Sequence, residues 1–279
     1  MKYIQLGQKK IGDGYPCFII AEASSNHGGD FKRAKKMIEV AAKAGADAVK
    51  FQVFTAENIA VDTEDPRTIV KIKEKSVFVD KDTKLIDLYR PNELPRSWLP
   101  KLAAYAKKRQ IIFLATPFDE QAVDQLEAVG VPMHKVASYE MQDVPLLRKI
   151  AATKKPILLS TGMANLRDIA ASLQVLKRAN SGPVILLHCR SIYPTPIDQV
   201  DLLAMEVMKK EFHLPVGFSD HTLGIGAPIA AASLGAVVIE KHFILDDGVN
   251  TIDDKFSLLP SELQRMITAI REAQLALGA

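Results

Sequence analysis

The segment VVIEKHFILDDG, residues 237–248, places a glutamate, a lysine and a histidine inside an apolar run. Burying an unpaired charge is costly, so these side chains either mark the wet end of a strand or are held there for chemistry. Other apolar runs end in the same way: the SDH tripeptide at 219–221 follows LPVGF, and AVKFQV contains Lys50 and Gln52. This repetition indicates one shared site rather than isolated polar residues.

Histidines suggest metal chemistry within this set. His221 and His242 end two consecutive apolar segments, and two imidazoles at neighbouring strand ends, with carboxylates nearby, are typical of a divalent-metal site. The spacing alone is not diagnostic. His188 is open to two interpretations, a site residue or a core histidine bonded to a carbonyl. His134 and His213 lie at the starts of apolar segments, where a structural role is expected.

Lysines and hydroxyl groups at the same segment ends suggest anion binding. Two cations with several hydroxyls suit a phosphate and a carboxylate on one small ligand. The set comprises Lys50, Thr116, Lys135, Ser138, Ser160 and Ser219. A lysine could instead form a Schiff base, as in some aldolases. The histidine pair makes that chemistry unnecessary, so we rank it lower.

Eight short segments rich in Val, Ile, Leu and Ala must position these residues. Their nearly continuous apolar content is that of a parallel sheet covered on both faces. The predicted strands are 17–23, 46–53, 111–116, 133–138, 156–161, 183–189, 214–219 and 236–243. Helical spacing is found in 31–45, 119–130, 165–179, 202–212 and 260–277. Strands that alternate with helices predict a (β/α)8 TIM barrel over 17–279, whose strand carboxyl ends form the active-site rim. An open doubly wound sheet is the alternative.

Two segments fall outside this alternation. Residues 1–16 predict a small β-hairpin with an IGDGYP turn that caps the barrel floor. Residues 55–95 are long, charged and irregular. An insertion of that length between a strand and its helix is usually an active-site lid or an interaction loop.

Composition narrows the function classes. The chain has 279 residues and a net charge of +3 from 36 basic and 33 acidic residues, a balance that argues against a nucleic-acid partner. It contains no apolar run of about 20 residues, so no membrane span is expected. The start of the sequence lacks the apolar core of a signal peptide. Cys17 and Cys189 lie in apolar runs with no sign of pairing, and we expect a cytoplasmic protein.

The sequence resembles the sialic acid synthase family, which includes synthases of N-acetylneuraminic, legionaminic and pseudaminic acids and spore-coat polysaccharide proteins. The resemblance runs from residue 17 to about 276. The matching stretches include IIAEASSNHGGD, AGADAVKFQVF, ATPFDEQAVDQLEAVGV, KVASYE, PILLSTGMA, LLHCRSIYPTP, PVGFSDHTLGIG, GAVVIEKHF and DDKFSLLPSEL. The resemblance implies a TIM-barrel synthase that condenses phosphoenolpyruvate with an open-chain N-acyl amino sugar, giving a nine-carbon 2-keto sugar acid.

The resemblance also implies residue roles. His221 and His242 would bind a divalent ion, manganese or magnesium, and Glu22 and Glu140 would join them in the catalytic set, Glu140 by helping to activate water. The residues that would hold phosphoenolpyruvate are Lys50, Thr116, Lys135, Ser138, Ser160, Ser191 and Ser219. The residues that would contact the sugar are Glu22, Gln52, Tyr193 and Asp253.

Three departures from the family pattern matter. The family usually carries a C-terminal antifreeze-like domain that reaches across a homodimer and supplies an arginine to the sugar's N-acyl group, whereas this sequence is expected to lack that domain, since it ends at Ala279. AEASSNHGG and HCRS replace the commoner AEIGxNHxG and HC followed by two small residues; Arg190 is a candidate for part of the missing arginine's role. Residues 250–253 stand where Gly-Pro-Asp is common, so the acceptor sugar could differ.

Two other functions remain open from the sequence. One is a non-catalytic barrel that binds phosphoenolpyruvate and metal as a module in surface glycan biosynthesis. The other is a relative that makes deoxy-octulosonate or deoxy-heptulosonate phosphate, against which the SDHT and EKHF stretches argue.

Overall fold

The computed structural model describes residues 3–71 and 81–278, and its main feature is one sheet of parallel strands. The eight strands are hydrogen-bonded in the order β7-β4-β3-β12-β11-β10-β9-β8. Their bounds are β3 (Phe18–Ser24), β4 (Ala48–Val53), β7 (Ile112–Pro117), β8 (His134–Val136), β9 (Ile157–Ser160), β10 (Val184–His188), β11 (Val216–Asp220) and β12 (Val238–His242). The first strand in the chain order, β3, pairs with the last, β12, and β7 packs beside β8. The sheet is therefore a nearly closed (β/α)8 barrel.

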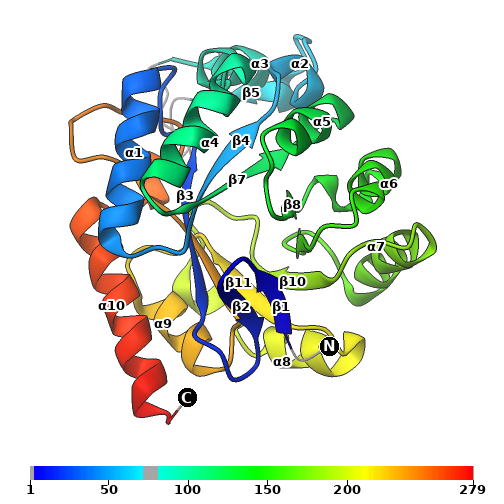
Figure 1. The fold of residues 1–279 in the computed structure, drawn as a ribbon. Coiled ribbons are helices and arrows are strands. Elements are labelled where there is room, and N and C mark those ends of the chain that lie inside the picture. The colour runs from blue at the N-terminus through cyan, green and yellow to red at the C-terminus, as the bar shows by residue number, and fades with distance from the viewer. Residues whose placement is uncertain (1–2, 72–80, 279) are drawn as a thin grey trace.

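Helices form a ring around this barrel (Figure 1). The ring consists of α1 (Phe31–Ala44), α4 (Leu99–Lys108), α5 (Glu120–Ala128), α6 (Val144–Ala152), α7 (Leu166–Arg178), α8 (Ala204–Phe212), α9 (Gly226–Ser233) and α10 (Pro260–Ala276). Side chains of Asp30, Asp119, Asp143 and Asn165 accept backbone N–H bonds at the starts of α1, α5, α6 and α7. These caps explain why the helical patterns in the sequence begin where they do.

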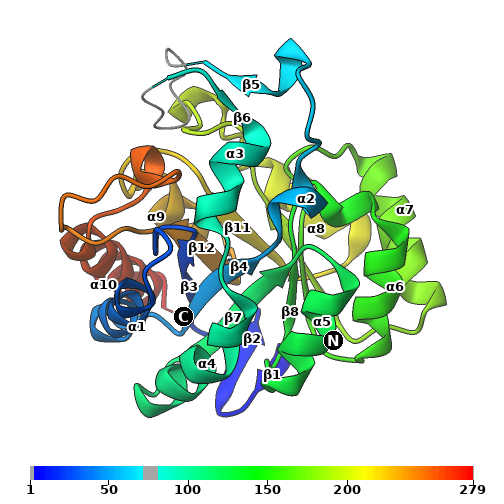
Figure 2. The ribbon, with the colours of Figure 1, turned by 90° about the horizontal axis from the view of Figure 1, so that it is seen from above.

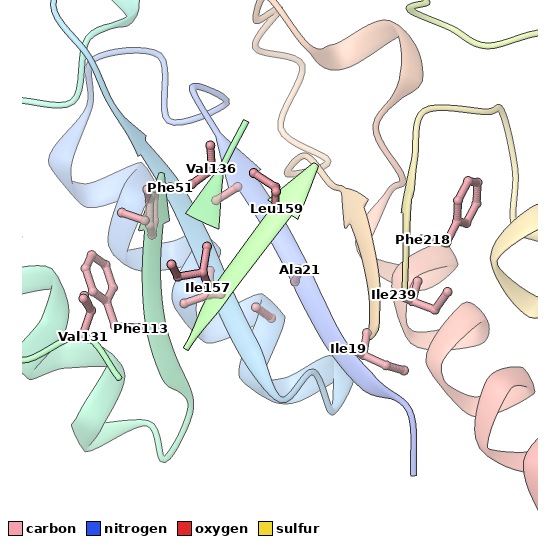
Figure 3. Close-up of a cluster of buried hydrophobic side chains, with 14 of the residues drawn as sticks. Ile19, Ala21, Phe51, Phe113, Val131, Val136, Ile157, Leu159, Phe218 and Ile239 are labelled. Carbon is pink, nitrogen blue, oxygen red and sulfur yellow. The ribbon is translucent and has the colours of Figure 1, made fainter. Parts of the chain in front are cut away.

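Strand alternation divides the apolar core into two layers. The larger layer lies between strands and helices and includes Ile19, Phe51 and Ile239 (Figure 3). The smaller one fills the barrel interior near the strand starts, where Ile20 and Leu158 are fully buried. Neighbouring residues of one strand point to opposite faces, so the inner face is apolar near the strand starts and free to be polar near the strand ends.

The N-terminal hairpin closes the floor of the barrel. It consists of β1 (Tyr3–Leu6) and β2 (Lys9–Gly12), which pair antiparallel, and Ile4, Leu6 and Ile11 join the inner apolar layer. The hairpin is confirmed, but the predicted turn is misplaced. Gly7, with φ of 56°, lies in the turn that joins the two strands, and the IGDGYP segment leads into β3 instead.

The insertion after β4 lies at the opposite end from the hairpin (Figure 2). Its short elements are α2 (Ala56–Ile59), η1 (Pro66–Thr68), β5 (Ile69–Val70), β6 (Thr83–Lys84), α3 (Leu85–Tyr89) and η2 (Arg90–Asn92). Part of the predicted lid, 72–80, lies outside the described residues. Further 3-10 turns are η3 (Arg96–Trp98), η4 (Glu140–Gln142), η5 (Ile197–Gln199) and η6 (Asp254–Phe256). Across 3–71 and 81–278, every helix is too short or too polar to cross a bilayer.

Candidate active site

A cavity of about 560 Å³ opens at the carboxyl ends of the barrel strands, between the inner face and the insertion. The predicted site residues that line it are Glu22, Lys50, Gln52, Thr116, Lys135, Ser138, Glu140, Ser160, Tyr193, Ser219, His221, His242 and Asp253. Ser191 is not part of the lining, but it lies close to Ser138, since a Cβ built on Gly162 would meet the hydroxyls of both. The fold therefore brings the whole predicted set to one place.

Lys50 lies at the bottom of the cavity, on β4. Its Nζ is 2.9 Å from Glu22 Oε2 and 3.6 Å from Glu240 Oε2, and it donates a 3.0 Å bond to Thr116 Oγ1. Burial would lower the pKa of this lysine, but the carboxylates of Glu22 and Glu240 outweigh burial and raise it. Lys50 is therefore a fixed positive charge.

Lys135 provides the second charge, on β8. Its Nζ donates to Ser160 Oγ at 2.7 Å and lies 3.7 Å from Glu240 Oε1, which also accepts from Ser219 Oγ at 3.0 Å. Burial lowers the pKa of Lys135, and Glu240 partly opposes that effect. Glu240 thus stands between two lysines, whose charges lower its pKa although burial acts in the other direction.

Glu22 is a further carboxyl group of this cluster. Burial raises its pKa to about 7, against the opposing effect of Lys50. Burial thus disfavours the ionised form of Glu22, whereas the charges of the two lysines favour the ionised form of Glu240. A buried lysine pair beside these carboxyls suits an anionic ligand.

The two histidines stand above this cluster at the cavity rim. The ring centroids of His221 and His242 are 5.5 Å apart. His221 Nδ1 is 2.9 Å from the carbonyl oxygen of Arg190, which assigns the proton to Nδ1 and leaves the Nε2 lone pair free. Burial lowers the pKa of His221 to about 4 and that of His242 well below its usual value, so both imidazoles are neutral.

These residues fit a divalent cation. Among the residues that the structure describes, no group of three or more His, Cys, Asp or Glu side chains is arranged to hold a metal ion by itself. Two neutral imidazoles are nevertheless suited to one, and His242 Nδ1 makes no hydrogen bond within the described chain. Asp253 Oδ2, 3.6 Å from that nitrogen, supplies a nearby carboxylate. These residues therefore suit an open metal site, in which water or substrate would complete the coordination of the ion.

Ser138, Ser191 and Gly162 lie close together beside the cavity. Gly162 N donates to Ser138 Oγ at 3.0 Å, and a Cβ at Gly162 would approach Ser191 Oγ to 2.6 Å. Only glycine fits without displacing those hydroxyls. Glu140 follows in η4, and burial raises its pKa to about 6. A carboxyl with such a pKa exchanges protons close to neutral pH.

Comparison with known proteins assigns the chain to a family. Residues 37–279 match the model of the NeuB family. The chain belongs to the NeuB family. N,N'-diacetyllegionaminic acid synthase of Campylobacter jejuni is 45% identical over 265 residues, which are 93% of this chain and 77% of that protein. The corresponding synthase of Legionella pneumophila is 38% identical over 277 residues, 98% and 76% of the two chains.

A solved structure agrees with this assignment. The crystal structure of N-acetylneuraminic acid synthetase from Leptospira borgpetersenii, in complex with citrate, has a TM-score of 0.88 and 34% identity to this chain. The match covers 99% of this chain and 90% of that one. The resemblance to the sialic acid synthase family is therefore confirmed, and several relatives of this NeuB-family chain are named as synthases of sialic-acid-type sugars.

Some residues of this NeuB-family site have roles that the sequence did not assign. Glu240 and His242 share the inner face of β12, whereas Lys241 points outward and pairs with Asp220 on β11 at 2.7 Å. Phe256, in η6, packs its ring 4.9 Å from His242. Glu240 could be noticed in the sequence as a charge within an apolar run. Phe256 lies outside the strands, where the hydrophobic pattern does not predict which residues face the cavity.

Contacts in the structure bear on two expectations about single residues. The side chain of Arg190 bonds the carbonyl of Gln199 at 2.9 Å and lies 3.5 Å from Asp201, outside the cavity lining. These contacts give no support to the hypothesis that Arg190 contacts the acceptor sugar, which stays a prediction. His188 Nε2 is 2.8 Å from the carbonyl of Val200, as the core-histidine interpretation requires.

Proposed function

We propose that this chain condenses phosphoenolpyruvate with an open-chain N-acyl amino sugar, giving a nine-carbon 2-keto sugar acid and phosphate. The observation that carries the proposal is one cavity with a buried lysine pair at its bottom and a neutral imidazole pair at its rim. The names of the relatives support the product class. A divalent cation, manganese or magnesium, completes the proposal.

Phosphoenolpyruvate would bind at the bottom of the cavity. Lys50 and Lys135 offer charge-assisted bonds to its phosphate and carboxylate. The hydroxyl groups bonded to these lysines, on Thr116 and Ser160, offer further donors. Held in this way, two anionic groups stay close together and oriented, which charge repulsion and lost entropy oppose in water. Glu240 would keep the two ammonium groups apart and oriented while the cavity is empty of anion.

The acceptor would lie nearer the rim, beside Glu22, Gln52, Tyr193 and Asp253. His221 and His242 would hold the cation, which supplies Lewis-acid activation of the aldehyde and orients a water. Tyr193 and Phe256 pack against the imidazoles, with centroids 4.4 Å from His221 and 4.9 Å from His242. These aromatic rings would fix the imidazole orientations and keep excess water out.

The bond changes balance without a redox partner. Carbon 3 of phosphoenolpyruvate attacks the aldehyde carbon, and the aldehyde oxygen gains a proton. Water adds to carbon 2, and Glu140 takes one of its protons. The bond between carbon 2 and the bridging oxygen then breaks, and phosphate leaves with that oxygen. The new hydroxyl on carbon 2 gives its proton to the departing phosphate and becomes the 2-keto group, while the proton taken by Glu140 balances the one gained by the aldehyde oxygen.

The test is phosphate release from phosphoenolpyruvate with manganese and a panel of N-acyl amino sugars, with product mass read in parallel. We expect release only when an acceptor is present, and a product equal in mass to acceptor plus pyruvate. Binding of phosphoenolpyruvate without release for every acceptor would favour the non-catalytic module. Release with a phosphorylated pentose or tetrose alone would favour an octulosonate or heptulosonate synthase.

A further inference from the structure

Ser24 ends β3 in a conformation that side chains rarely adopt. Its φ is 48°, in the left-handed region, and the pairing of β3 with β4 shifts register between Glu22 and Ser24. Of the non-glycine residues with positive φ in the described chain, Ser24 alone lies within a strand of the barrel. A buried residue held in such a conformation indicates that its side chain is needed at that point.

The side chain of Ser24 makes one specific contact. Its hydroxyl donates a hydrogen bond to Asp253 Oδ2. Asp253 lines the cavity, and its Oδ2 is 3.6 Å from His242 Nδ1. Ser24 therefore holds, from behind, a carboxylate whose remaining lone pairs are available to the cavity.

The loop that carries Asp253 is anchored independently of Ser24. Asn26 Nδ2 donates to the carbonyl of Phe243 and to Ser257 Oγ, each at 2.9 Å, and Asn26 Oδ1 accepts from Thr251 Oγ1 at 2.6 Å. These bonds fasten the loop on both sides of Asp253. The Ser24 hydroxyl is thus not required to hold the loop, and its effect is confined to the carboxylate.

We propose that Ser24 is a positioning residue that directs the carboxylate of Asp253 toward the acceptor sugar, and that this pair sets acceptor preference in this chain. The inference rests on the proposed function. The acceptor it fits presents hydroxyl or amide N–H donors to an oriented carboxylate. Ser24 and Asp253 are 229 positions apart in the sequence and are brought into contact by the fold.

The experiment compares three variants of the full chain. Ser24→Ala removes the hydroxyl and keeps a Cβ at positive φ, whereas Ser24→Gly removes the hydroxyl and relieves the backbone. Ser25→Ala is the matched control, because Ser25 Oγ is buried and has no hydrogen-bond partner among the described residues. Steady-state KM for acceptor and for phosphoenolpyruvate is measured for each, together with Tm.

We expect both Ser24 variants to raise the acceptor KM by about tenfold, the usual effect of losing a hydrogen bond to a charged group. KM for phosphoenolpyruvate should stay within about twofold, and Ser25→Ala should match the parent. Because glycine tolerates positive φ, Ser24→Gly should have the higher Tm of the two. The acceptor KM would then depend on whether the Ser24 hydroxyl is present and not on the Tm of the variant.

Three outcomes would overturn the inference. Unchanged acceptor KM in both Ser24 variants would show that the hydroxyl does not act on the acceptor. Acceptor KM that follows Tm, with alanine impaired and glycine normal, would make Ser24 merely structural. A parent that is inactive with every acceptor would instead overturn the proposed function and, with it, the sugar-side role of Ser24.

Discussion

Lys50 and Lys135 are the two lysines among the described residues that line the cavity, and both are almost fully buried. Each has a hydroxyl within bonding distance, Thr116 for Lys50 and Ser160 for Lys135. A buried ammonium beside a neutral hydroxyl retains bonding capacity for an anion. At the scale of single residues, the proposal therefore depends on these two charges.

Replacing Lys135 by Met, or Lys50 by Met, should weaken phosphoenolpyruvate binding by about 2 kcal/mol or more, since a charge-assisted bond is lost. Isothermal titration without acceptor measures the dissociation constant. Lys149→Met, at a half-buried surface lysine that pairs with Asp124, is the control and should bind as the parent does. An unchanged constant for both cavity variants would assign the lysines a structural role. A borohydride-reducible adduct on either would support a Schiff base.

Glu140 should give the reaction an acidic limb. Burial raises the pKa of its carboxyl to about 6. The carboxyl is therefore fully ionised well above pH 6, and the ionised form is lost as the pH falls through 6. We expect kcat to rise through about pH 6 and then level. In Glu140→Gln the limb should vanish and kcat should fall about 100-fold. A pH–rate profile that keeps the same limb in this variant would exclude Glu140 as the base.

At the scale of elements, β11 and β12 hold the histidines through alternation of their side chains. His242 ends β12 and His221 directly follows β11, and both line the cavity, while Asp220 and Lys241, each one residue earlier in the chain, pair on the outer side at 2.7 Å. Asp220 also accepts from the N–H of Thr222 at 2.9 Å. The outer pair therefore fixes the relative position of the two strand ends.

Breaking this pair should be costly. Lys241→Met leaves Asp220 buried without its counter-charge, and we expect the free energy of unfolding to fall by about 3–5 kcal/mol. Combining it with Asp220→Asn should cost less than the sum of the single changes, because the second change removes the stranded charge. Denaturant unfolding measures all three variants. A loss below about 1 kcal/mol in Lys241→Met, as for an exposed pair, would contradict this account.

Element type and order were predictable because burial leaves a periodic signal. The eight apolar segments are the eight strands, and the lysines, histidines and several hydroxyl residues of the cavity were found because they lie at or just beyond the ends of such segments. Tyr193 and Asp253 lie in loops and were expected only from the family resemblance. Contacts between loops leave no such signal. The bond of Ser24 to Asp253 spans 229 positions, and the side chain of Arg190 turns to Gln199 through a local bond. Those arrangements depend on loop geometry, which residue spacing does not encode.

At the scale of the whole molecule, the two ends of the barrel serve different purposes. The hairpin fills the floor with Ile4, Leu6 and Ile11, and the cavity occupies the opposite end beneath the insertion. Polar chemistry at one end therefore depends on apolar packing at the other only through overall stability. Mutations at the floor should separate stability from ligand binding.

Ile11→Ala tests that separation. Ile11 is fully buried in the inner apolar layer, so its truncation should lower the free energy of unfolding by about 2–5 kcal/mol. The dissociation constant for phosphoenolpyruvate should remain within about twofold of the parent value. A large change in affinity at a temperature where the variant is folded would show that floor and cavity are coupled.

The proposed reaction joins phosphoenolpyruvate to an amino sugar with cleavage of the bond between carbon 2 and the bridging oxygen. The most direct measurement follows phosphoenolpyruvate labelled with oxygen-18 at the bridging position, with manganese and the acceptor that turns over fastest. We expect the label to leave in phosphate and the 2-keto acid to carry oxygen from water. Label retained in the keto acid, or no condensation product with any acceptor, would rule out this reaction.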